Sequence, residues 1–114
     1  MKILVLEDDS YRATTFIEKF CDHDVTITEN AGIAMEYLEE DTFDWIFLDH
    51  DLGENNGCGA DVAALLACNA DNANNNARII VHSWNVPAAK AMVGMLPQAR
   101  HIPFGSDAFF LLDS

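Results

Sequence analysis

The chain has 114 residues, half of them hydrophobic, so it can bury one core and is too apolar for general disorder. Nineteen acidic against six basic residues give a formal net charge of −13, which argues against long nucleic acid or an anionic membrane surface as partner. The sequence has neither the apolar run of a secretory signal nor a stretch that approaches a membrane span. We therefore expect a single cytoplasmic domain whose three cysteines are reduced.

Three runs in the first half of the chain predict strands. Residues 2–6, which are apolar after Lys2, and residues 45–48, which are all apolar, are typical of strands buried on both faces of a parallel sheet. Residues 25–28 alternate apolar and polar side chains. Helices are expected after the first two runs, and their candidate caps are Asp9 or Ser10 and then Asn30. The apolar stripes of these helices are Ala13, Phe16, Ile17 and Phe20, and then Ala31, Ala34, Tyr37 and Leu38.

The second half continues the alternation. The expected elements are a helix over 60–68, a strand over 78–81, a helix that begins at Pro87, a weaker strand over 98–102 and a short helix over 106–112. Their expected inward side chains include Val62, Leu65, Leu66, Phe109, Phe110 and Leu112. The asparagine-rich residues 69–76 predict a surface connection. This order favours an α/β fold, a doubly wound five-stranded parallel sheet with helices on both faces.

Polar residues follow several of the predicted strands, and in such sheets ligands bind outside the carboxyl ends of the strands. These residues are Glu7, Asp8 and Asp9, then Asp49, His50 and Asp51, then His82, Ser83, Trp84 and Asn85, with His101 as a further candidate. Carboxylates from two strand ends are hard oxygen ligands that suit Mg²⁺ or Mn²⁺. The alternative is that the first three acids are solvated, with Asp9 acting only as a helix cap.

The two histidines of this set offer proton transfer, because imidazole titrates near neutral pH. One of His50 and His82 could act as general base and the other as general acid in cleaving a phosphoester, or either could bind Zn²⁺ or Mn²⁺. Alternatively, strand alternation could turn either one into a helix interface as a core histidine. Ser83 offers its hydroxyl to a phosphoryl oxygen, and Trp84 offers an aromatic wall.

Two other residues have a structural and a functional interpretation. Asn85 either binds an anion or caps the helix that follows it, and the cap is the simpler interpretation. Arg12 either reaches the pocket and pairs with a carboxylate, or is a solvated residue on a helix.

The order of elements and several motifs resemble the response-regulator receiver domain over essentially the whole chain. Residues 3–9 resemble the first strand and acidic pair of that family, and residues 44–49 resemble its third strand. The resemblance implies a flavodoxin-like, receiver-like domain over residues 1–114, in which Glu7 and Asp8 bind metal and Asp49 accepts a phosphoryl group. Residues 79–83 resemble the fourth strand, which puts Ser83 at the position of the hydroxyl that senses the phosphoryl group.

The chain departs from the receiver pattern in three places. Ile102 precedes Pro103 and Phe104 where the family has a lysine, so the cation that neutralises the phosphoryl group is missing. The loop after Asp49 is longer and carries His50 and Asp51, with no proline after Leu52. The last helix is abbreviated.

A second, narrower resemblance accounts for these departures. The pairing of Leu-Asp-His-Asp-Leu at residues 48–52 with Val-His-Ser-Trp-Asn at residues 81–85 is similar to the cyclic-phosphate processing receiver domains, which are predicted phosphoesterases. This resemblance implies that the active-site residues are Asp49, His50, Asp51, His82 and Ser83, with Asn85 nearby.

The leading hypothesis is thus a metal-assisted phosphoesterase acting on a cyclic nucleotide or an RNA 2′,3′-cyclic phosphate end. Glu7, Asp8 and Asp49 would hold a divalent metal, Mg²⁺ first, with Mn²⁺ or Zn²⁺ as alternatives. Asp51 would orient His50 or complete the metal shell. One rival is a phosphorylatable receiver with Asp49 as acceptor. The other is a degenerate, non-catalytic receiver that binds or inhibits a protein partner, for which a basic partner would suit the acidic surface.

Overall fold

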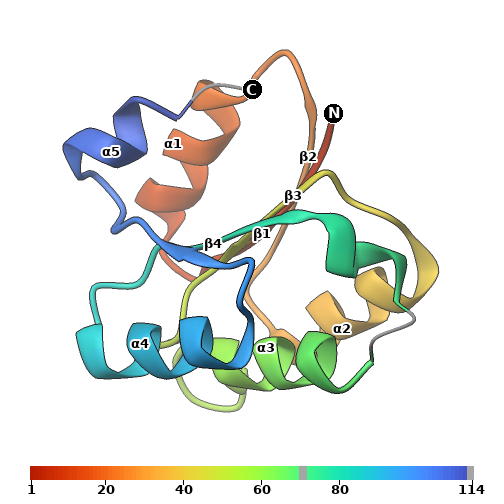
Figure 1. Ribbon diagram of the computed structural model, residues 1–114. Coiled ribbons are helices and arrows are strands. Elements are labelled where there is room, and N and C mark those ends of the chain that lie inside the picture. Colours follow the sequence, from red (N-terminus) through yellow and green to blue (C-terminus); the bar gives the residue numbers. More distant parts are fainter. Residues whose placement is uncertain (70–71, 113–114) are drawn as a thin grey trace.

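The computed structural model describes residues 1–69 and 72–112, and its centre is one parallel sheet (Figure 1). Its strands lie in the order β2-β1-β3-β4-β5. They are β1 (Lys2–Leu6), β2 (Asp24–Thr28), β3 (Trp45–Leu48), β4 (Arg78–Val81) and β5 (Arg100–His101). The predicted parallel sheet is confirmed, and β1, β3 and β4 have the predicted bounds because polar residues flank their apolar runs. β5 is shorter than predicted, because Ala99 closes a turn by donating its N–H to the Leu96 carbonyl.

Helices cover both faces of the sheet (Figure 1). They are α1 (Ser10–Lys19), α2 (Ala31–Glu40), α3 (Gly59–Cys68), α4 (Val86–Met95) and α5 (Asp107–Phe110). The side chains of Asp9, Asn30, Asn85 and Ser106 accept backbone N–H groups at the starts of α1, α2, α4 and α5. Because Asn85 is the cap, α4 begins at Val86, one residue earlier than predicted, and Pro87 is its second residue.

The side chains on the two faces of β1 pack in two different hydrophobic clusters, because successive side chains of a strand point to opposite faces. Leu4 and Leu6 pack with α2, α3 and α4 in an aliphatic cluster. Ile3 and Val5 pack with α1 and α5 in an aromatic cluster that contains Phe16, Phe20, Trp45, Phe47 and Phe109. The Phe16 ring meets those of Phe47 and Phe109 edge-on.

Three of the predicted inward side chains are exposed. Ile17 and Tyr37 face away from the sheet, because α1 and α2 each bury only a narrow stripe. Phe110 is exposed because α5 has only four residues and docks mainly through Phe109. Leu65 is half-buried, whereas Val62 and Leu66 face the core as predicted.

The asparagine-rich stretch is more than a surface connection, and that prediction is wrong at Asn74. Residues Ala73–Asn76 form a short 3₁₀-helix whose Asn74 side chain is buried. Its Nδ2 donates to the carbonyls of Leu38 and Asp41, at 2.9 and 2.8 Å, and its Oδ1 accepts the Phe43 N–H at 2.7 Å. Asn74 thus satisfies backbone groups between α2 and β3. Residues 70–71 of the same predicted connection lie outside the described residues.

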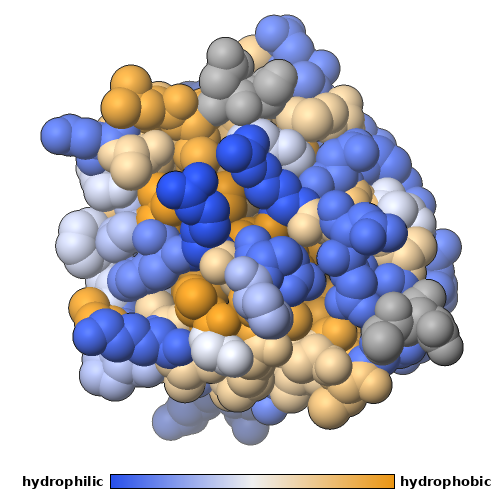
Figure 2. All heavy atoms as spheres, viewed as in Figure 1, coloured by the Kyte–Doolittle hydropathy of each residue, from blue (hydrophilic) through white to orange (hydrophobic). Residues whose placement is uncertain are grey.

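Hydrophilic and hydrophobic residues are intermixed on the face of the molecule that Figure 2 shows. Among the described residues no helix combines the length and the hydropathy that a membrane crossing requires.

Candidate functional site

Three polar residues occupy equivalent positions at the carboxyl ends of the central strands. Leu6, Leu48 and Val81 are in register across β1, β3 and β4, so the residues that follow them also share a row. We call these residues, Glu7, Asp49 and His82, the buried row, since their exposed fractions are 2%, 3% and 0%. The strand period of two turns their side chains toward α1 and α5, the same face as Val5 and Phe47.

Glu7 has hydrogen-bond partners on both carboxylate oxygens. Its Oε2 accepts the backbone N–H groups of Asp8 and Asp9 at 3.0 and 3.1 Å. Its Oε1 lies 3.0 Å from His82 Nε2 and 3.8 Å from Arg12 Nη1. Burial nevertheless raises the pKa of Glu7, because desolvation outweighs these favourable contacts.

The Asp49 carboxylate has fewer hydrogen-bond donors close to it than the Glu7 carboxylate. Its Oδ1 accepts the His50 N–H at 2.8 Å, while its Oδ2 lies 3.8 Å from Arg12 Nη1, beyond hydrogen-bonding distance. Burial raises the pKa of Asp49 to about 6, and the nearby Glu7 charge acts in the same direction. Burial thus disfavours the charged form of the Asp49 carboxylate.

His82 lies inside the aromatic cluster, 5.0 Å from the Phe16 ring and 6.3 Å from the Phe47 ring, centre to centre. Burial lowers its pKa to about 4, so the imidazole is neutral at pH 7. The Glu7 carboxylate can only accept, so Nε2 carries the proton and donates it. Nδ1 is buried and has no hydrogen-bond partner among the described residues. The core-histidine interpretation thus describes the position of His82.

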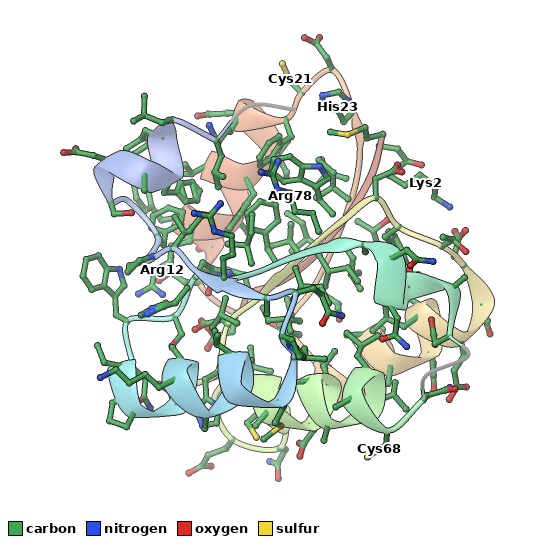
Figure 3. All side chains as sticks on the ribbon, in the orientation of Figure 1. Lys2, Arg12, Cys21, His23, Cys68 and Arg78 are labelled. Atoms are coloured by element: carbon green, nitrogen blue, oxygen red, sulfur yellow. The ribbon has the colours of Figure 1, made fainter. Side chains whose placement is uncertain are left out.

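A cleft of about 390 Å³ opens beside the buried row. Its lining residues are Asp8, Asp9, Arg12, Asp49, Asp51, Ser83, Trp84 and Asn85. Asp49 is therefore the member of the buried row that reaches this cleft. We call Asp8, Asp51, Trp84 and Asn85, which are exposed or half-buried, the cleft rim. Arg12 extends from α1 toward this end of the sheet (Figure 3).

The cleft rim is held together by α4 and by the loop after β5. Asn85 Oδ1 accepts the Ala88 N–H at 3.2 Å, which confirms the predicted cap, and Asn85 Nδ2 donates to Asp51 at 3.3 Å. Ser83 Oγ accepts the Asn85 N–H at 3.0 Å, which leaves the hydroxyl proton free for another acceptor. The Trp84 ring is 60% exposed and donates its Nε1–H to the Phe104 carbonyl.

The remaining histidines lie outside the cleft lining. His50 is half-buried, and its Nδ1 is buried with no hydrogen-bond partner among the described residues. His101 places Nε2 2.8 Å from the Ser83 carbonyl, where it supports the loop after β4. The structure thus brings Asp49, Asp51 and Ser83 to one cleft, whereas neither His50 nor His82 is among the residues that line it.

One residue that the backbone around Asp49 requires was not identified from the sequence. Gly59 begins α3 directly against the Asp49 backbone, and its N–H donates to the His50 carbonyl. A Cβ on Gly59 would lie 1.9 Å from the Asp49 carbonyl oxygen, a distance that no packing allows. The pair of glycines at 57 and 59 after a strand was the available signal of a close backbone approach.

A potential metal site coincides with the buried row. Glu7, Asp49 and His82 each place a possible ligand atom within 4.8 Å of the others. The exposed carboxylate of Asp8 lines the adjacent cleft.

Comparison with known proteins gives a family match and a set of structural neighbours. The family model described as "Cyclic-phosphate processing Receiver domain" matches residues 2–98. No curated protein matches the chain.

The solved structures resemble this one in fold. Their sequence identities are low, so the similarity establishes the fold and no more. The phosphorylated cyanobacterial phytochrome response regulator RcpA has a TM-score of 0.76 and 20% identity, over 96% of this chain and 85% of that one. The Mn²⁺-bound form of response regulator Rcp1 has a TM-score of 0.73 and 20% identity, over 96% and 86%. A CheY-like receiver domain from Methylobacillus flagellatus has a TM-score of 0.72 and 16% identity, over 94% and 88%.

Proposed function

The chain belongs to the cyclic-phosphate processing receiver domain family, and from the geometry of its site we propose that it accepts a phosphoryl group on Asp49, assisted by a divalent cation. One observation carries the proposal: Asp49 is buried at the end of a central strand yet lines the cleft. Its carboxylate is held in place by the His50 N–H, while Oδ2 lies 3.8 Å from Arg12 Nη1, beyond hydrogen-bonding distance. A fixed carboxylate that faces a cleft is a nucleophile positioned for attack.

The residues present fit a hard divalent cation. Glu7 and Asp49 are two desolvated carboxylates whose pKa values burial raises, so their anionic forms lack adequate compensation. With the exposed Asp8 carboxylate of the cleft turned toward them, they would form an all-oxygen donor set that suits Mg²⁺ or Mn²⁺, and the neighbour Rcp1 has a Mn²⁺-bound form. Zn²⁺ would also draw on a ring nitrogen of His82, whose Nε2 is engaged by Glu7. When bound, the cation would neutralise charge on the phosphoryl oxygens.

The residues of this chain then have distinct tasks. An Asp49 carboxylate oxygen forms a bond to phosphorus, and the bond between phosphorus and the leaving oxygen breaks. With acetyl phosphate as donor the leaving group is acetate, which departs as an anion and needs no proton at pH 7. The Ser83 oxygen accepts the Asn85 N–H, and its hydroxyl proton is available to donate to a phosphoryl oxygen. His82 keeps Glu7 in position from inside the core.

Intact-mass measurement after incubation with acetyl phosphate and Mg²⁺ tests the proposal. The wild-type protein should gain the mass of one phosphoryl group, and Asp49→Asn should gain none. Asp22→Asn is the matched control, since it removes an exposed carboxylate that does not line the cleft. Modification of Asp49→Asn to the wild-type extent, or none of the wild type, would overturn it.

A second candidate function is hydrolysis of a cyclic phosphate, which the description of the family favours. The exposed Trp84 ring on the cleft rim supports it, because such a ring can stack a nucleobase. In this reaction Asp49 would attack phosphorus, one ribose oxygen would leave and take a proton, and water would then hydrolyse the acyl phosphate. His50 and His82 remain the proposed acid and base, although each would have to turn toward the cleft.

Incubation with 2′,3′-cyclic mononucleotides and Mg²⁺ or Mn²⁺ tests this second candidate. Chromatography should show a nucleoside monophosphate, and Asp49→Asn or His82→Gln should abolish its formation. If neither metal supports turnover, hydrolysis of these substrates is ruled out. The proposal that Asp49 accepts a phosphoryl group is then decided by the acetyl phosphate experiment alone.

A further inference from the structure

Phosphorylation of Asp49 creates an electrostatic problem at this site. A phosphoryl group carries roughly −1.5 to −2 charges near pH 7. It would be added beside Glu7, Asp8 and Asp51, in a protein whose formal net charge is already −13. A single bound cation leaves much of this charge uncompensated, so a fixed positive group of the protein is needed near Asp49.

The basic residues of the chain differ in what they contact. Lys2 pairs with Asp41 at the amino end of β1, Lys19 Nζ donates to the carbonyls of Phe110 and Leu112, and Arg78 lies over the Trp45 ring. Lys90 and Arg100 are exposed and do not line the cleft. Within the described part of the chain, Arg12 is the one basic residue among the cleft-lining side chains. Figure 3 shows Arg12 and Lys2 on opposite sides of the molecule.

Arg12 is held in a position from which it can reach a group on Asp49. It lies in the first turn of α1, where its backbone N–H donates to the Asp9 cap at 3.0 Å. Its guanidinium carbon lies 5.8 Å from the centre of the Phe104 ring, so the side chain is supported from the β5 side. Its Nη1 is 3.8 Å from both Asp49 Oδ2 and Glu7 Oε1. This separation is that of an ion pair and is too long for a hydrogen bond, so turning to a new acceptor on Asp49 breaks no hydrogen bond to these two carboxylates.

Ile102 shows that the segment directly after β5 supplies no such cation. The residue before Pro103 is 7% exposed and packs in the aromatic cluster. Its side chain is apolar and buried, so the positive group must come from another element.

From this arrangement we infer that Arg12, supplied by α1, is the residue that binds the phosphoryl group on Asp49. The inference rests on the proposed phosphoryl acceptance and goes beyond it by assigning the missing cation. Arginine suits the task, because its planar guanidinium stays charged and binds two phosphoryl oxygens at once.

The test compares three variants during phosphorylation by acetyl phosphate with Mg²⁺. Arg12→Gln should slow the reaction by on the order of 100-fold, the usual effect of removing one donor to a developing anion. Arg12→Lys should be intermediate. Lys90→Gln, which removes the same charge from the exposed face of α4, should react at the wild-type rate. Arg12→Gln at the wild-type rate, or Arg12→Lys no faster than Arg12→Gln, would overturn the inference.

A metal-binding measurement separates this role from damage to the site. Arg12 is a positive charge 3.8 Å from two carboxylates, so Arg12→Gln should bind Mn²⁺ at least as tightly as the wild type. A variant that loses Mn²⁺ binding together with phosphorylation would point to a structural role and count against the inference.

Thermal unfolding in inorganic phosphate with Mg²⁺ separates the inference from the proposed function. Phosphate should raise the melting temperature of the wild type and leave that of Arg12→Gln unchanged. If acetyl phosphate does not modify the wild type but this difference is seen, phosphoryl acceptance fails and the anion-binding role of Arg12 stands. If phosphate stabilises both proteins equally or neither of them, the role of Arg12 fails.

Discussion

The buried row and the cleft rim meet at the same strand ends but differ in how they are held. Glu7 and His82 of the buried row are tied to each other and to the core, and their environment opposes charge. The cleft rim is open to solvent and is connected by longer contacts such as that of Asn85 with Asp51. Asp49 belongs to the buried row and also reaches the cleft. The difference teaches that the buried row fixes the position of Asp49 and disfavours its charge, while the cleft rim remains accessible to solvent.

The largest expected effect concerns the backbone that supports Asp49. Gly59→Ala should lower the free energy of unfolding by about 3 kcal/mol, because the added Cβ would overlap the Asp49 carbonyl oxygen and force α3 away from β3. Gly94→Ala in α4 is the matched control, since a Cβ there meets nothing within 4 Å. It should raise stability by roughly 0.5–1 kcal/mol through helix propensity. Urea unfolding measures both, and equal effects would contradict the close approach.

The second prediction concerns His82 and pH, in metal-free buffer. Burial lowers the folded-state pKa of His82 to about 4, below the ordinary value of 6.5. Between these values the unfolded chain binds a proton that the folded protein does not, so this residue costs stability as the pH falls. His82→Gln keeps a donor for Glu7 but does not titrate. Relative to the wild type, it should therefore gain about 2–3 kcal/mol between pH 7 and about pH 4.

Asp49 acts in the opposite direction over the same range. Its folded-state pKa is raised to about 6, so the folded protein binds the proton first and gains stability as the pH falls. Glu7, whose pKa burial also raises, acts in the same direction as Asp49, so both carboxyl groups offset the loss of stability that His82 causes. A constant difference in stability between wild type and His82→Gln across this range would show that His82 is not held neutral.

The smallest effect compares the two regions directly. In the absence of metal, Asp49→Asn should raise the free energy of unfolding at pH 7 by about 1–2 kcal/mol, since it removes a carboxylate whose charge burial disfavours. Asp8→Asn on the exposed rim should change it by less than about 0.5 kcal/mol. Denaturant unfolding measures both. Equal effects would mean that the burial of Asp49 has no energetic consequence.

Much of the fold follows from local patterns. The apolar runs of β1, β3 and β4 and the caps at Asp9, Asn30 and Asn85 agree with the sequence, because strand burial and helix capping depend on neighbouring residues. The burial of Asn74 was not predictable, since its partners lie more than thirty residues away in the chain.

The site was predicted less completely than the fold. The strand-end rule grouped Asp49, Asp51 and Ser83 correctly at one cleft. The orientation of His82 depends on the register of three strands and on how α1 packs, which no local pattern specifies. The distance from Arg12 to Asp49 depends on where α1 sits over the sheet. The catalytic and metal-binding roles assigned to these residues remain predictions.

Phosphorus NMR of the protein after reaction with acetyl phosphate and Mg²⁺ tests the central claim most directly, because it identifies the bond that holds the phosphoryl group. We predict a single acyl phosphate signal that is absent in Asp49→Asn and that hydroxylamine removes. A phosphoramidate signal from a histidine, or a phosphate ester signal from Ser83, would contradict the account.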